Sequence, residues 1–343
     1  MATTLYDDLR ALATEHDFSG AVAVSRDGER LVEFARGAAD RANQRPNTLG
    51  TRFGTASVAK GLTAITVASL IESGHLRPDT TLRSLLPDSL PMVDPAVTIE
   101  HLLGNTSGVG DYLDEEELGD VDDYIMTVPV HRLDAPASYL PALDGYPQKS
   151  PPGATFAYNN GGYVMLSIAT EAATGRSFYE LVQERALDPA GMADTGFERS
   201  DNLPAGAAIG YLADGRSNVL HLPVRGAGDG GVYSTVSDLE SFWLALFAGR
   251  ILPTSVVDGL VEPRNDVPSQ RRRYGLGFWL SPDRDTVFLE GMDAGVSCRT
   301  AYDRPSGITY AVIANDSEGA WPLVGYLDEH LTTLSRPARM PRA

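Results

Sequence analysis

The chain has 343 residues, of which 43% are hydrophobic and 22% are charged, and this composition is typical of a folded globular protein rather than a disordered or fibrous one. Its 46 acidic and 28 basic side chains give a formal net charge of −18, which disfavours binding to nucleic acid or to an anionic membrane surface. A single cysteine, Cys298, excludes an internal disulfide and a cysteine-built zinc site.

The start of the chain carries neither a cationic segment nor an apolar signal core. No later run approaches the ~20 apolar residues that a membrane span needs. We therefore expect a cytoplasmic protein with no membrane partner.

Apolar periodicity predicts both helices and strands in the first 75 residues. The expected elements are a helix over residues 5–15, a hairpin with strands over 20–25 and 31–35, and a buried helix over 57–72. Asp27 and Gly28 supply the turn chemistry that a short hairpin needs, and Gly74 supplies a stop for the buried helix.

The strand pattern fades between about residues 80 and 225 and then returns. The expected elements are helices over 99–103, 163–174, 178–186 and 236–248, strands over 274–280, 286–289, 296–302 and 308–314, and a closing helix over 321–334. The middle of the chain is therefore predicted to be helical, with loops rich in proline and glycine.

This order of elements predicts an α+β fold. An antiparallel sheet flanked by helices is expected from the N- and C-terminal segments, with an all-helical lobe inserted between them. The α/β lobe is expected to comprise residues 1–80 and 226–343, and the helical lobe residues 81–225. A chain of this length is long enough for two lobes that share one site.

Residues 111–123 contain eight acidic side chains and no basic one. Like charges in a run repel one another and stay hydrated, so we expect a solvated surface loop. The alternative is a lip that attracts cations over an active site.

Ser57 and Lys60 lie three residues apart at the start of the predicted buried helix, so their side chains share one face. Burial would lower the pKa of the Lys60 amine, and the helix N-terminus favours a developing alkoxide on Ser57. The amine could therefore act as general base without a histidine. Lysine is rare in this chain, the second one being Lys149.

A second pair, Tyr158 and Asn160, lies about a hundred residues downstream at the mouth of a predicted helix. A phenol beside an ammonium group can move protons, and an amide can orient both a lysine and a substrate carbonyl. Taken alone, Tyr158 is equally well explained as a core aromatic residue.

Together these two pairs resemble the motifs of the penicillin-recognising serine hydrolases, which include class C β-lactamases, D-Ala-D-Ala carboxypeptidases and related esterases and D-aminopeptidases. Further segments carry the resemblance from about residue 20 to residue 315, namely 101–109, 152–163, 187–195 and 228–239. The resemblance implies a β-lactamase/transpeptidase-like fold with Ser57 in the cleft between two lobes, and an acyl-enzyme on Ser57 that needs no cofactor and no metal.

The family's third motif, Lys-Thr-Gly or His-x-Gly, is replaced here by residues 289–291, Leu-Glu-Gly. In the family the cation of this motif helps to hold a substrate carboxylate. Leu289 brings no charge, and Glu290 and Asp293 bring the opposite one. We therefore expect a small neutral or cationic ester or amide as substrate rather than a penicillin. The alternative is that another cation, one of residues 271–273 or Arg299, folds into the missing position, which would favour a β-lactamase.

Gly291 still permits close approach of the backbone, and the N–H of Met292 would complete an oxyanion hole with the N–H of Ser57. The predicted catalytic residues are Ser57, Lys60 and Tyr158, and the predicted substrate-binding residues are Asn160, Gly291, Met292 and Asp293.

Alternative functions remain open at this point. A β-lactamase or D-Ala-D-Ala carboxypeptidase is the first alternative to an esterase or peptidase. A non-catalytic sensor or binding protein, acylated without turnover, is an alternative of another class. A standard α/β-hydrolase is excluded, because no serine stands in a Gly-x-Ser-x-Gly motif. The expected partner is a small molecule, and the oligomeric state is left open.

Overall fold

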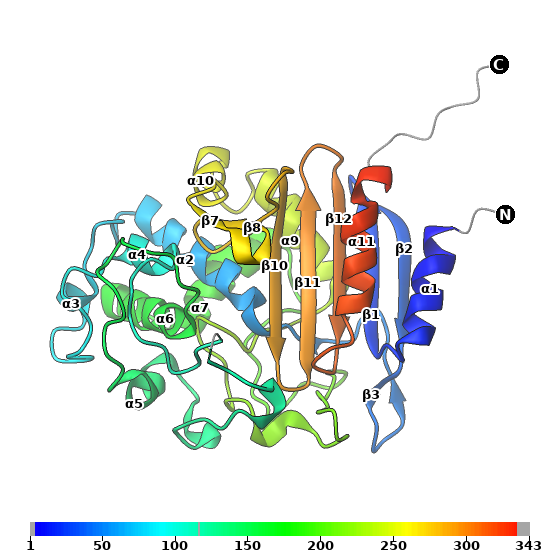
Figure 1. The fold of residues 1–343 in the computed structure, drawn as a ribbon, viewed down its shortest axis with the longest axis horizontal. Coiled ribbons are helices and arrows are strands. Elements are labelled where there is room, and N and C mark those ends of the chain that lie inside the picture. Colours follow the sequence, from blue (N-terminus) through cyan, green and yellow to red (C-terminus); the bar gives the residue numbers. More distant parts are fainter. Residues whose placement is uncertain (1–3, 116, 335–343) are drawn as a thin grey trace.

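The computed structural model describes residues 4–115 and 117–334; residues 1–3, 116 and 335–343 lie outside it, among them Glu116 of the acidic run. An eight-stranded antiparallel sheet forms the body of the fold, in the order β2-β1-β12-β11-β10-β9-β8-β7 (Figure 1). Its strands are β1 (Gly20–Arg26), β2 (Glu29–Arg36), β7 (Asn265–Val267), β8 (Arg272–Tyr274), β9 (Trp279–Leu280), β10 (Thr286–Asp293), β11 (Val296–Asp303) and β12 (Ile308–Ala314). The predicted α+β fold with an antiparallel sheet is confirmed, whereas the division into two lobes at the stated boundaries stays a prediction.

Strands from the two ends of the chain pair with each other inside the sheet, next to its β2 edge. β1 pairs with β12 from Gly20 opposite Ala314 through to Arg26 opposite Ile308, and every residue of β12 is buried. The predicted hairpin is also present, with Asp27 at φ 50° and Gly28 at φ 81°. Two successive positive φ angles give the turn the twist that suits a two-residue hairpin.

Helices cover both faces of the sheet. The predicted first helix, α1 (Leu5–Glu15), packs beside the closing helix α11 (Trp321–Leu334) on one face. The other face carries α9 (Val236–Phe247), and Figure 1 shows α11 and α9 on opposite sides of β11 and β12. Each face therefore encloses its own apolar core.

The remaining helices lie mostly beyond β10, at the left of Figure 1. They are α2 (Ala59–Glu72), α3 (Leu82–Leu85), α4 (Ile99–Leu103), α5 (Leu140–Leu143), α6 (Asn160–Thr174), α7 (Phe178–Val182), α8 (Asp188–Ala190) and α10 (Thr254–Leu260). Short strands β3 (Ala38–Asp40) and β4 (Arg45–Pro46) pair with each other, as do β5 (Phe53–Gly54) and β6 (Tyr233–Ser234). No helix in the described part of the chain combines the length and apolar character needed to cross a bilayer.

The prediction of one strand over residues 274–280 was wrong. The chain turns back on itself there, so that β8 and β9 pair as a tight hairpin instead. The turn contains Gly277 at φ 89°, where an added Cβ would lie 2.3 Å from the Cβ of Ala64 on α2. Contact with α2 therefore bends a segment whose apolar pattern, taken locally, is that of a strand.

Candidate active site

Ser57 lies in a turn of 3-10 helix, Ala56–Val58, that leads directly into α2. The residue before it, Ala56, has a φ of 48°, a left-handed conformation that side chains with a Cβ rarely adopt. Strained backbone of this kind concentrates at functional sites, where surrounding contacts hold it in place. Ser57 itself is only partly buried, so its hydroxyl is accessible beside a fixed turn.

Lys60 is 2% exposed, and its amine is held by three oxygen atoms. Nζ lies 2.8 Å from Ser57 Oγ, 2.7 Å from Asn160 Oδ1 and 3.0 Å from the backbone oxygen of Asp229. Burial lowers the pKa of this amine, and nearby carboxylates, Asp229 first, counteract part of that effect. The structure thus brings the two residues of the first motif together in hydrogen-bonding geometry.

Tyr158 meets the same pair from the other side. Its phenol interacts with Ser57, and its ring centroid lies 4.8 Å from Lys60 Nζ. The ring stacks on Trp279 at a centroid distance of 5.5 Å and an interplanar angle of 20°. Burial raises the pKa of the phenol well above its ordinary value, so Tyr158 keeps its proton and offers it as a donor.

Asn160 is the first residue of α6, and protein atoms engage both ends of its amide. Oδ1 accepts from Lys60, while Nδ2 donates to the backbone oxygen of Leu113 at 2.9 Å and to Glu115. This geometry supports a positioning role for Asn160 towards Lys60. Its contact with substrate stays a prediction.

The acidic run does not lie wholly in solvent, contrary to the expected hydrated loop. Asp111 is 5% exposed and accepts hydrogen bonds from the backbone N–H groups of Asn160 and Gly161, where it caps α6. Further along, Leu113 and Glu115 line the cavities beside Ser57. Part of the segment therefore lies beside Ser57, whereas its expected attraction of cations stays a prediction.

The edge of β10 faces Ser57. β9 pairs with only Val287 and Phe288, so no strand among the described residues lies beside the edge of β10 beyond them. On that edge the backbone oxygen of Thr286 accepts a hydrogen bond from the backbone N–H of Ser281. Every second residue of a strand directs its backbone N–H and C=O groups to the same side, and Met292 lies an even number of residues after Thr286. The N–H of Met292 therefore points to the open edge. An added Cβ on Gly291 would lie 2.4 Å from the Ser57 nitrogen, so only glycine lets the two backbones approach this closely.

The side chain at the expected cation position points into the core. Leu289 is 2% exposed and packs on Gly61 of α2, where an added Cβ would lie 2.5 Å from Leu289 Cδ1. Glu290, the next residue, forms ion pairs with Arg272 of β8 and Arg299 of β11. Both arginines line a cavity together with Ser57.

Sequence reasoning named Arg272 and Arg299 among the cations that could take the missing position, but it did not predict their pairing with Glu290. The signal was available, because Glu290 and Arg299 are direct cross-strand partners in the hairpin of β10 and β11. Arg299 also donates to Asp328 of α11 at 2.6 Å. The group thus contains two arginines and two carboxylates, with no surplus of positive charge.

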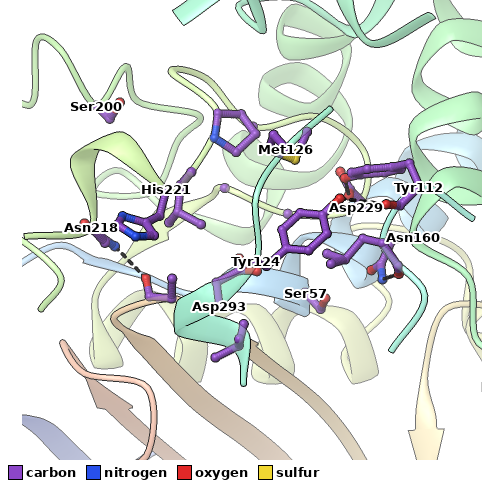
Figure 2. Close-up of a pocket in the computed structure, with 18 of the residues that line it drawn as sticks. Ser57, Tyr112, Tyr124, Met126, Asn160, Ser200, Asn218, His221, Asp229 and Asp293 are labelled. Carbon is purple, nitrogen blue, oxygen red and sulfur yellow. Dashed lines mark hydrogen bonds between the residues drawn. The ribbon is translucent and has the colours of Figure 1, made fainter. Parts of the chain in front are cut away.

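Two cavities meet at Ser57. The first has a volume of about 80 Å³, and Figure 2 shows Ser57, Asn160 and Asp229 at one side of its lining and Asn218 and His221 at the other. The second has a volume of about 350 Å³ and is lined by Tyr158, Trp279, Met292 and the arginine group. Asp293 lines both of them.

Comparisons with known proteins agree with this geometry. The profile of the family described as Beta-lactamase matches residues 7–328. Penicillin-binding protein 4* of Bacillus subtilis is 29% identical over 307 residues, covering 80% of this chain and 63% of that protein. Esterase EstB of Burkholderia gladioli is 30% identical, covering 77% of this chain and 75% of the esterase.

A crystal structure of a penicillin binding protein from Bacillus halodurans superposes with a TM-score of 0.87. It is 35% identical in sequence and covers 94% of this chain and 99% of its own. The chain spans a little under two thirds of the length of the Bacillus subtilis relative.

Proposed function

Because the chain belongs to the Beta-lactamase family, we propose that it is a serine hydrolase that forms an acyl-enzyme on Ser57 with a small ester or amide. The observation that carries the proposal is the 2.8 Å contact between Ser57 Oγ and a buried lysine amine, at the point where two cavities meet. A nucleophile beside a base that other groups hold in place is the arrangement that acyl transfer requires.

Lys60 acts as the general base in this proposal. A neutral amine has two N–H donors, and Asn160 and the Asp229 backbone oxygen accept both of them. The lone pair then faces the Ser57 hydroxyl, which donates to it and passes its proton to Lys60 as the oxygen attacks the carbonyl carbon.

The N–H groups of Ser57 and Met292 stabilise the oxyanion that forms on the former carbonyl oxygen. Tyr158, which keeps its proton, relays one to the leaving group and later takes part in activating the water that releases the acyl group. Because Tyr158 lines the larger cavity only, the leaving group departs on that side and the acyl part lies towards the smaller cavity.

The substrate is neutral or cationic in this proposal rather than a penicillin. Arg272 and Arg299 are the arginines of the larger cavity, and both are already paired with Glu290. A substrate carboxylate would have to displace Glu290 from these contacts. Hydrogen bonds between charged groups contribute about 1.5–3 kcal/mol each, so this displacement would cost a penicillin much of its binding energy.

Fluorophosphonate labelling followed by peptide mass analysis tests the nucleophile directly, and the modified residue is expected to be Ser57. Hydrolysis of p-nitrophenyl butanoate is expected to fall by at least about a thousandfold in Ser57→Ala. Ser255→Ala, an exposed serine on α10, serves as the control and should match the native protein. Retention of more than a few per cent of activity in Ser57→Ala would reject the assignment.

The same assay separates the alternatives. Steady turnover of the ester indicates an enzyme, whereas a single stoichiometric burst of p-nitrophenol indicates an acylated binding protein. A kcat/KM for nitrocefin above that for the butanoate ester would reject the proposed substrate class and favour a β-lactamase.

A further inference from the structure

The smaller cavity beside Ser57 has a distinctive chemical lining. Four tyrosines line it, Tyr112, Tyr124, Tyr139 and Tyr233, and none of the described residues that line it is a lysine or an arginine. Its volume of about 80 Å³ leaves room for a group of only a few heavy atoms, since one water needs roughly 10–15 Å³ on the same measure. The cavity therefore suits a small substituent close to the reacting carbonyl.

Carboxylates dominate the charge of this cavity. Asp229 is 7% exposed, and Asp293, Glu115 and Glu198 join it in the lining. Glu198 is already paired with Arg52 at 3.2 Å. Against the other three carboxylates, Lys60 supplies at most one positive charge, and it supplies none when it acts as a neutral base. A bound cation would balance the excess negative charge and would gain from the electron-rich faces of tyrosine rings.

Asp293 is the carboxylate that is free to bind a ligand. In the part of the chain that the structure describes, no hydrogen bond or ion pair engages its side chain. Asp229, by contrast, accepts a hydrogen bond from Tyr112, and Glu115 accepts one from Asn160. Figure 2 shows Asp293 beside Ser57. Asp293 is the last residue of β10 and follows Met292, whose N–H is proposed to bind the oxyanion.

The carboxylates are not arranged as a metal site. Among the described residues, no group of three or more His, Cys, Asp or Glu side chains is placed so that it could hold a metal ion. An organic ammonium group has directional N–H bonds and can also interact with ring faces, so it fits carboxylates that are set apart around aromatic rings.

We propose that the smaller cavity binds an ammonium group carried by the acyl part of the substrate, with Asp293 as its ionic partner. The proposal rests on the serine hydrolase function above and narrows its substrate to amine-bearing acyl esters or amides. The cation belongs to the acyl part because Tyr158, the donor to the leaving group, lines the other cavity. The amine takes no part in bond making and acts only in binding and orientation.

Two p-nitrophenyl esters of matched size test this directly. The 3-aminopropanoate carries an ammonium group where the butanoate carries a methyl group. The native protein is expected to show a kcat/KM at least tenfold higher for the ammonium ester, because an ion pair with hydrogen bonding discriminates by this factor or more. In Asp293→Asn the ratio of the two kcat/KM values is expected to fall at least tenfold.

Asp266→Asn, an exposed aspartate on β7, is the matched control and should keep the native ratio. Fluorophosphonate labelling of Ser57 in Asp293→Asn shows that the variant still assembles its site. Equal or lower kcat/KM for the ammonium ester in the native protein, or an unchanged ratio in Asp293→Asn, would overturn the ammonium site while leaving the hydrolase intact. Failure of the native protein to hydrolyse either ester would instead reject the hydrolase function and the ammonium site with it.

Discussion

Replacing Asp293 with asparagine should stabilise the folded protein, although it removes a residue of the active site. Burial raises the pKa of the Asp293 carboxyl from 3.8 to about 7, and the neighbouring charge of Asp229 adds to this effect. Lys60 opposes it and Glu115 reinforces it. The folded state therefore holds the proton of Asp293 more tightly than the unfolded chain does.

The sign of the effect follows from this difference. As the pH rises from about 4 to about 7, the unfolded chain ionises at this position before the folded protein does, so stability is lost across that window. Above pH 7 Asp293 is ionised in both states, and the full loss of folding stability remains. A shift of about 3 pKa units at 1.36 kcal/mol each sets an upper limit of about 4 kcal/mol. Asparagine resembles the neutral acid and escapes this penalty.

Urea unfolding at pH 5.5 and pH 8.0 measures the difference. Asp293→Asn is expected to be more stable than the native protein by up to about 4 kcal/mol at pH 8.0 and by about half as much at pH 5.5. Asp266→Asn should show no such pH-dependent gain. A variant that is less stable than the native protein at pH 8.0, or a gain that does not grow with pH, would refute the reasoning.

The remaining predictions concern catalysis. Lys60→Arg keeps the positive charge but cannot act as a neutral base, so ester turnover should fall at least about a thousandfold, whereas turnover by Lys149→Arg should be near native. Equal losses of the two variants in steady-state assays would contradict the role of Lys60. Gly291→Ala would place a methyl group 2.4 Å from the Ser57 nitrogen and should abolish turnover. A native kcat in this variant would show that the backbone relaxes freely. Tyr158→Phe keeps the ring but loses the hydroxyl, so steady-state kcat should fall about a hundredfold or more with little change in KM. An unchanged kcat would show that Tyr158 does not transfer a proton to the leaving group.

The fold and the family could be predicted from sequence because their signals are local. Ser57 and Lys60 share a face through helical spacing alone, and the strands at the two chain ends show clear periodicity. The match of residues 7–328 to the Beta-lactamase profile confirmed the resemblance that these motifs indicated.

What sequence reasoning missed or left open depends on contacts between distant segments. Arg272 and Arg299 reach the site only through the register of β8 and β11 with β10, and the part played by Asp229 lies in a backbone oxygen that no residue pattern reveals. The break between β8 and β9 likewise follows from packing on α2. In each case tertiary contacts decide what local propensity leaves undetermined.

The pairing of β1 with β12 has a consequence for how the chain is made. Gly20 leaves the ribosome well before its partner Ala314, which lies nearly three hundred residues further along the chain. At roughly 5–20 residues per second, the interval is about 15–60 s. During that time one edge of β1 lacks its β12 partner, and Ser57 lacks the strand that faces it until β10 has been made. A nascent chain can therefore build the helices that precede β10 in order, but it acquires a complete active site only when β10 emerges.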